Sequence, residues 1–224
     1  METGLAEFAR SALLVIGALF PIVNPLGNVP FFLTLTPGYT SDMHAALARK
    51  IAMYGFILMG VSILIGTNIL AFFGISLPVV QVGGGMVVVA TAWSLLNRKE
   101  DPDGKTTKVS ASAADISRRA FYPLTLPLTV GPGSISVAIT LGANAPHHQG
   151  FYLLSILTAI VGSLLLAVSI FVCYGFADRL GRVLGRTGMT VIIQLTSFLL
   201  VCIGVQILWN GVSALLVSLP WHGR

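Results

Sequence analysis

Apolar residues fill six long stretches of this chain, and polar or charged residues gather in the segments between them. The stretches cover about residues 5–35, 51–72, 79–96, 119–143, 151–176 and 190–217. A helix needs roughly 20 mostly apolar residues to cross a bilayer. The pattern therefore predicts six membrane-spanning segments that form a single membrane domain over residues 1–224.

Two of the six segments carry three prolines each, at the same spacing. The first segment reads FPIVNPLGNVP over residues 20–30, and the fourth reads YPLTLPLTVGP over residues 122–132. The prolines are Pro21, Pro25 and Pro30 in the first set and Pro123, Pro127 and Pro132 in the second. Proline lacks a backbone donor and clashes with the preceding helical turn. The first and fourth segments are therefore predicted to be broken helices.

The matching prolines indicate that the chain contains two copies of one unit. Repeat 1 covers about residues 5–97, repeat 2 covers about 119–217, and a charged loop over about 97–118 joins them. Each repeat has three segments, an odd number, so the two copies face opposite ways across the membrane. The predicted fold is an all-α membrane protein of six transmembrane helices, arranged as two inverted three-helix repeats with helices 1 and 4 broken.

Composition and charge agree with a membrane protein. Hydrophobic residues make up 55% of the chain and charged residues 9%, with a mean hydropathy of +0.88, whereas a soluble domain has about 25% charged residues. Of the 13 Lys and Arg residues, all but Arg10 and Arg224 fall on one predicted side. The net charge of +5 is therefore interpreted as a topology signal and not as nucleic-acid binding. It predicts a bacterial inner-membrane protein with a cytoplasmic central loop and both termini in the periplasm.

The two predicted breaks contain the residues best suited to bind a solute. These candidates are Asn24, Gly27 and Asn28 in the first break, and Thr125, Thr129, Gly131, Gly133 and Ser134 in the second. The N-terminus of a half-helix attracts a carboxylate, while opposed carbonyls and asparagine side chains suit an ammonium or a sodium ion. The alternative is a pair of proline kinks used only for packing. Gln81 and Gln194, in the third segment of each repeat, either line a cavity or bond across helices.

Other chemistry has no visible site in the sequence. All eight acidic residues fall in termini, loops or segment ends, and the four histidines are placed in solvated loops or the tail. Cys173 and Cys202 have neither metal-ligand spacing nor a CxxC pattern. No nucleophile, base and orienting group occur together, so we expect no enzyme, catalytic residue, metal or cofactor. A small neutral or zwitterionic solute fits such a chain, and sodium coupling stays open.

The residues now show a resemblance to a known family. FPIVNPLGNVPFFL at residues 20–33, FGISLP at 73–78 and LPLTVGPGSIS at 126–136 resemble signature stretches of the MarC family. The family is named for a multiple-antibiotic-resistance locus and includes proteins described as transporters of neutral amino acids. The resemblance implies a secondary transporter of small neutral amino acids such as glycine or alanine, with alternating access around the two broken helices and export as one of the two directions open to it. It places Asn24, Pro25 and Gly27 in one signature and Gly131, Pro132 and Gly133 in the other.

Two other classes of protein stay open at this point. A transmembrane thiol carrier has similar inverted halves, but it needs one cysteine in each equivalent segment, and both cysteines here lie in the second half. A passive channel or a non-transporting scaffold is the other alternative. The sequence leaves open the substrate, the direction of transport, any homo-oligomer and any role in antibiotic resistance.

Overall fold

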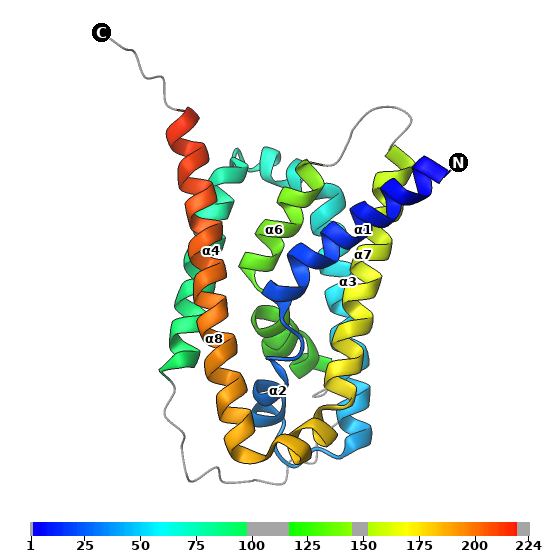
Figure 1. Cartoon of the computed structure of the whole chain (residues 1–224), viewed down its shortest axis with the longest axis vertical. Coiled ribbons are helices and arrows are strands. Elements are labelled where there is room, and N and C mark those ends of the chain that lie inside the picture. The colour runs from blue at the N-terminus through cyan, green and yellow to red at the C-terminus, as the bar shows by residue number, and fades with distance from the viewer. Residues whose placement is uncertain (1, 98–116, 145–151, 219–224) are drawn as a thin grey trace.

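The computed structural model describes residues 2–97, 117–144 and 152–218, and every regular element among them is helical (Figure 1). The elements are α1 (Glu2–Val23), α2 (Val29–Leu35), α3 (Ser41–Phe72), α4 (Leu77–Leu96), η1 (Ala120–Thr129), α6 (Pro132–Ala143), α7 (Tyr152–Gly175) and α8 (Ala177–Ser218). The all-α prediction is confirmed. Most of the predicted charged loop lies outside the described residues, and so do three of the four histidines, His147, His148 and His222.

Four of the described helices are long and apolar enough to cross a membrane. They are α3, α4, the Ser155–Gly175 part of α7 and the Thr187–Ser218 part of α8. Arg10–Val23 and Pro132–Ala143 are apolar but shorter. The two proline-containing segments thus differ from the other four, because each consists of two helices separated by a break: α1 and α2 in the first, η1 and α6 in the second.

Two helices begin earlier than the apolar pattern predicts. α3 begins at Ser41 and not near residue 51, because Thr40 caps it: its side-chain oxygen accepts a hydrogen bond from the Met43 N–H at 3.3 Å. α8 begins at Ala177 and bends at Gly185, whose φ is 61°. These added turns are polar, so hydropathy alone assigned them to loops.

The helices pack in matched pairs. α3 packs against α7, and α4 packs against α8. The broken elements also have corresponding neighbours. The helices before the breaks pack on the α3–α7 pair, with α1 on α7 and η1 on α3. The helices after the breaks pack on the α4–α8 pair, with α2 on α8 and α6 on α4. In Figure 1, α2 and α6 lie between the α3–α7 pair and the α4–α8 pair. The fold therefore places both breaks between the two pairs of long helices.

Glycines in α4 allow the closest helix contacts. A Cβ at Gly85 would lie 2.6 Å from the backbone nitrogen of Leu208 in α8, and one at Gly84 would lie 2.9 Å from the Ser136 side chain in α6. A Cβ at Gly83 would meet nothing within 4 Å. The packing interpretation of this glycine run is thus confirmed for Gly84 and Gly85.

The chain ends share one end of the bundle. Figure 1 shows the start of α1 and the end of α8 at the top, whereas α3 and α8 begin at the bottom. α3 and α7 run in opposite directions, and so do α4 and α8. Near the start of α3, the Lys50 ammonium donates a hydrogen bond to Ser117, just before η1. The beginnings of α3 and α8 therefore bring basic residues toward the end of the bundle opposite the termini.

Candidate functional site

The first break follows α1 and covers residues 24–28. Asn24 has a φ of 45°, in the left-handed region, where asparagine is tolerated better than most residues. Its side-chain oxygen accepts a hydrogen bond from the Gly27 N–H at 3.1 Å. Pro21 lies within α1, Pro25 lies in the break, and Pro30 lies in the first turn of α2, where its missing N–H costs nothing. The local sequence thus ends one helix and starts another within a few residues.

The second break lies between η1 and α6. Tyr122 and Leu126 have extended φ and ψ angles, which is the conformation that a following proline favours. Pro123 and Pro127 therefore interrupt the regular helical conformation of η1. At the end of this element the Val130 N–H donates to the Thr125 carbonyl at 2.8 Å. Gly131 caps α6, and Pro132 occupies its first turn.

The two breaks touch one another through Asn28. Its side-chain nitrogen donates to the Val23 carbonyl at 2.8 Å and to the Leu128 carbonyl at 3.2 Å. Val23 ends α1, and Leu128 lies near the end of η1. Asn28 is 4% exposed, so this amide binds both breaks inside the protein. The prediction that two separate segments meet has a direct contact here.

A small cavity adjoins the second break. It has a volume of about 50 Å³, and Thr129, Gly131, Gly133 and Ser134 line one side of it. The rest of the lining comes from η1, the first turn of α6, α1, α8 and a face of α4, at Leu128, Pro132, Ile22, Leu200, Val87, Val88, Thr91 and Ala92. A water needs about 10–15 Å³ by this kind of measure, so the cavity has room for a few waters or a very small solute.

Hydroxyl groups give this cavity its polar character. The Thr129 hydroxyl lies 2.8 Å from the Tyr174 hydroxyl and donates to the Leu124 carbonyl at 2.7 Å. The Ser134 hydroxyl donates to the Gly131 carbonyl at 2.9 Å. All residues that line the cavity are uncharged. The arrangement suits a neutral or zwitterionic molecule better than one with a net charge.

The remaining predicted site residues lie outside this cavity. Gly27 packs against Thr196 of α8, where a Cβ would lie 2.4 Å from the Thr196 methyl carbon. The buried Thr125 hydroxyl donates to the Ala120 carbonyl at 2.6 Å. Gln81 donates to the Thr140 hydroxyl at 3.1 Å, so it bonds across α4 and α6. Gln194 is exposed on α8. The structure therefore brings the second-break residues together around a cavity and places Gln81 and Gln194 elsewhere.

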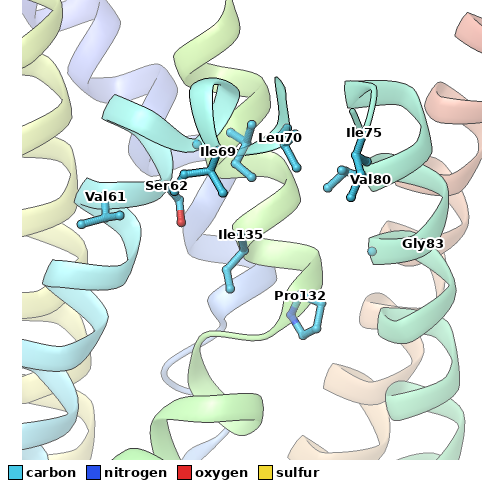
Figure 2. Close-up of a pocket in the computed structure, with 12 residues that line it drawn as sticks. Val61, Ser62, Ile69, Leu70, Ile75, Val80, Gly83, Pro132 and Ile135 are labelled. Carbon is cyan, nitrogen blue, oxygen red and sulfur yellow. The ribbon is translucent and has the colours of Figure 1, made fainter. Parts of the chain in front are cut away.

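A second, larger cavity is almost entirely apolar. It has a volume of about 520 Å³ and lies between α3, the start of α4 and α6. Figure 2 shows Leu70 and Pro132, from α3 and α6, on one side of it and Ile75, Val80 and Gly83 on the other. Pro132, in the first turn of α6, lines both cavities. The small cavity is the better binding site, because it holds the convergent polar groups that a specific site needs.

Several residues at the site were not expected from the sequence. Tyr174, Thr196 and Thr91 lie in apolar segments and contact the breaks or the small cavity. A polar residue within a membrane helix is the only signal that could have found them. One expectation is wrong: His44, placed in a solvated loop, is 3% exposed and pairs with Asp178. The reason is that α3 begins at Ser41, which turns this histidine into the bundle.

A helical bundle with four apolar spans, two broken elements and an uncharged cavity defines a polytopic membrane protein. The chain matches the MarC family integral membrane protein model over residues 10–216. It therefore belongs to the MarC family, as the resemblance implied, and contacts the lipid bilayer.

Curated relatives span nearly the same length. The chain is 32% identical to membrane protein YvbG of Bacillus subtilis (strain 168), over 88% of this chain and 92% of that protein. It is 30% identical to inner membrane protein MarC of Salmonella typhimurium, over 87% and 90%, and 30% identical to membrane protein YhcE of Escherichia coli (strain K12), over 90% and 91%. No solved structure matches this chain.

Proposed function

We propose that this protein is a secondary transporter of small neutral amino acids such as glycine or alanine. The observation that carries the proposal is the contact between the two breaks beside a small uncharged cavity. Asn28 bonds the Leu128 carbonyl, and the next residue, Thr129, lines the cavity. Transporters of inverted-repeat design bind their substrates near such discontinuous helices.

The packing of the helices supports an inverted repeat. In the proposed arrangement α1 corresponds to η1, α2 to α6, α3 to α7 and α4 to α8. The contact of α1 with α7 then corresponds to that of η1 with α3, and α2 with α8 corresponds to α6 with α4. The opposite directions of α3 and α7, and of α4 and α8, agree with this pairing (Figure 1). Six membrane crossings follow if α1 with α2 counts as one crossing and η1 with α6 as another.

The orientation that we propose follows from the basic residues. Arg49, Lys50, Arg179 and Arg182 belong to the starts of α3 and α8, at the end of the bundle opposite both termini. The positive-inside rule makes that end cytoplasmic and places both termini in the periplasm. An inner-membrane location agrees with the name of the Salmonella relative.

The second break offers complementary groups for a zwitterion. The first helical bond of α6 runs from the Ile135 N–H to the Gly131 carbonyl, so the N–H groups of Gly133 and Ser134 precede the helical ladder. These groups and the helix dipole favour a carboxylate. The Leu128 carbonyl, which accepts one bond from Asn28, and the Thr129 hydroxyl provide acceptors for an ammonium group. In this proposal the protein is a carrier and not an enzyme, and it needs no cofactor.

Transport in proteoliposomes tests the proposal. We expect counterflow of labelled glycine or alanine against an equal internal pool, measured with and without sodium. Gly131→Leu should fill the cavity and reduce this exchange to background. Gly17→Leu is the matched control, because a Cβ at Gly17 would meet nothing within 4 Å. Gly17→Leu should exchange at the wild-type rate.

The same assay separates the alternatives. A passive channel would show flux without counterflow, and a scaffold would show neither. A Cys173→Ser/Cys202→Ser variant should keep full exchange, because neither cysteine lines the small cavity. Full exchange by Gly131→Leu would remove the proposed site, and loss of function in the double serine variant would revive the thiol carrier.

A further inference from the structure

A histidine, a carboxylate and a hydroxyl form a cluster at the end of the bundle opposite the termini. The Nδ1 atom of His44 lies 3.0 Å from both carboxylate oxygens of Asp178. The Nε2 atom lies 2.9 Å from the Thr36 hydroxyl oxygen. That hydroxyl is also 2.7 Å from the Phe32 carbonyl, to which it donates. The cluster joins the end of α2 to the starts of α3 and α8 and lies outside both cavities.

The hydrogen bonds determine how many protons this cluster needs. An ionised carboxylate only accepts, so Nδ1 of His44 carries a proton toward Asp178. The Thr36 hydroxyl has a single proton, and the Phe32 carbonyl uses it. For the third contact to be a hydrogen bond, Nε2 must donate as well. All three bonds therefore form together only when His44 carries protons on both nitrogens.

Loss of one proton leaves the cluster short of a donor. With Nε2 unprotonated, the Thr36 hydroxyl can donate either to Nε2 or to the Phe32 carbonyl, but not to both. Thr36 is 1% exposed, so water does not readily replace the missing partner. The last turn of α2 is therefore bound more firmly when His44 is doubly protonated.

Aromatic contacts connect this cluster to the candidate transport site. The Phe32 ring packs on His44, with ring centroids 5.2 Å apart, and stacks on Tyr174 at 4.7 Å. The Tyr174 hydroxyl in turn lies 2.8 Å from the Thr129 hydroxyl, which lines the small cavity. A movement of α2 would therefore displace Phe32 and, through Tyr174, affect Thr129 at the second break.

We propose that His44 is a proton-binding site of this protein, at which the proton on Nε2 fixes α2 to α3 and α8. The proton comes from the solution at that end of the bundle and returns to it, since the Asp178 side chain is 28% exposed. Histidine is the side chain that ordinarily changes charge between pH 5 and 8. The consequence for solute flux rests on the proposed transport function, whereas the binding of α2 does not.

Charged and titratable groups face His44 from the elements packed around it. Asp178 provides the facing negative charge, and Ser41 donates to the same carboxylate at 2.9 Å. Arg182 acts on Asp178 from the next turn of α8. Tyr39 stacks on the imidazole at 6.0 Å, and Tyr174 faces it through Phe32. Asp178 is the one acidic group among these neighbours.

Hydrogen exchange of α2 tests the site without any transport assay. Purified wild-type protein and His44→Gln are compared between pH 5.5 and 8.5. At each pH the exchange rate of residues 29–35 in the wild type is divided by the rate in His44→Gln. The ratio removes the intrinsic pH dependence of exchange. We expect wild-type α2 to lose protection as pH rises, by on the order of two- to tenfold, the factor that one lost hydrogen bond gives. A constant ratio would overturn the proposal.

Two further variants keep the test decisive if His44→Gln does not fold. Thr36→Val removes the hydroxyl but leaves the histidine, so the change of α2 protection with pH should disappear. Asp178→Asn keeps an acceptor for Nδ1 but removes the negative charge, so the midpoint of the wild-type change should move to lower pH. An unmoved midpoint in Asp178→Asn would contradict the proposed site.

Flux measurements then distinguish this inference from the proposed function. Where glycine or alanine exchange is present, it should slow as the pH at the Asp178 end falls, and His44→Gln should remove that dependence. Exchange with the same pH profile in both proteins would end the link to transport. If wild-type protein exchanges no amino acid at any pH, the proposed function fails, and the exchange of α2 still decides whether His44 binds the proton.

Discussion

The Asn28 side chain donates a hydrogen bond to the backbone carbonyl of Leu128 at 3.2 Å, although the two residues are 100 positions apart. The same nitrogen donates to the Val23 carbonyl at 2.8 Å. One amide thus serves carbonyls from both broken elements. Backbone groups freed at membrane depth must find partners inside the protein or in a water-filled cavity. Asn28 therefore stabilises the two breaks and also joins them.

Replacing this amide should weaken the contact between the breaks. Asn28→Leu has a similar size but no donor, so two buried carbonyls lose a partner. We expect the free energy of unfolding to fall by about 1–3 kcal/mol and amino acid exchange to drop with it. Thermal unfolding in detergent measures the first effect, and proteoliposome counterflow measures the second.

Asn97 offers a matched control for that experiment. Its side-chain amide also donates to a backbone carbonyl, that of Trp93 at 2.9 Å, but it is exposed at the end of α4. Asn97→Leu should change stability by no more than about 0.5 kcal/mol. Equal losses in the two variants would mean that the Asn28 contact has no special importance.

The sequence predicted the breaks well but not their partners. Proline chemistry located both interruptions, because Pro25 and Pro127 act on the backbone around them and need no distant contact. Asn28, Gly27 and His44 each also contact a distant segment, at Leu128, Thr196 and Asp178 respectively. These contacts depend on tertiary packing that no local pattern encodes. Gln81 illustrates the limit, since its sequence position left a cavity and a cross-helix bond equally open, and the structure shows the bond to Thr140.

Space at the second break should be essential for the proposed binding. A Cβ at Gly133 would lie 2.0 Å from the Cγ2 atom of Val88, and both residues line the small cavity. Gly133→Ala should therefore displace α4 from α6 and reduce exchange at least about tenfold, since a displacement of roughly 1 Å can cost that much or more. Initial rates of counterflow provide the measurement.

The matched rescue variant is Val88→Ala combined with Gly133→Ala. It removes the methyl group that the new Cβ meets, so exchange should return toward the wild-type rate. Val88→Ala alone enlarges the small cavity that Val88 lines, so its own rate is the reference against which the rescue is judged. If the double variant stays as slow as Gly133→Ala, then the alanine acts through something other than the contact with Val88.

Two neighbouring glycines of α4 should respond differently to the same change. A Cβ at Gly85 would lie 2.6 Å from the Leu208 nitrogen and 2.8 Å from the Gly204 carbonyl oxygen, both rigid backbone atoms. Gly85→Ala should therefore push α8 away and cost about 1–3 kcal/mol. Gly83→Ala meets open space and should be neutral or slightly stabilising, because alanine favours the helix. Thermal unfolding compares them, and equal melting temperatures would contradict the α4–α8 packing.

The carboxylate of Asp178 should make stability depend on pH in the acid range. Partial burial raises its pKa, but hydrogen bonds from His44 and Ser41 and the charges of His44 and Arg182 outweigh burial, so the pKa is lowered overall. A group with a lowered pKa in the folded protein stabilises it above the pKa of the unfolded chain, and that contribution is lost as pH falls through the folded value. Asp178→Asn should therefore melt at a lower temperature than wild type at pH 7, and the difference should shrink toward pH 3.

Asp42→Asn, an exposed change in the first turn of α3, should show only the small effect of the helix dipole. A gap between wild type and Asp178→Asn that stays constant from pH 7 to pH 3 would show that the ion pair with His44 does not contribute to stability.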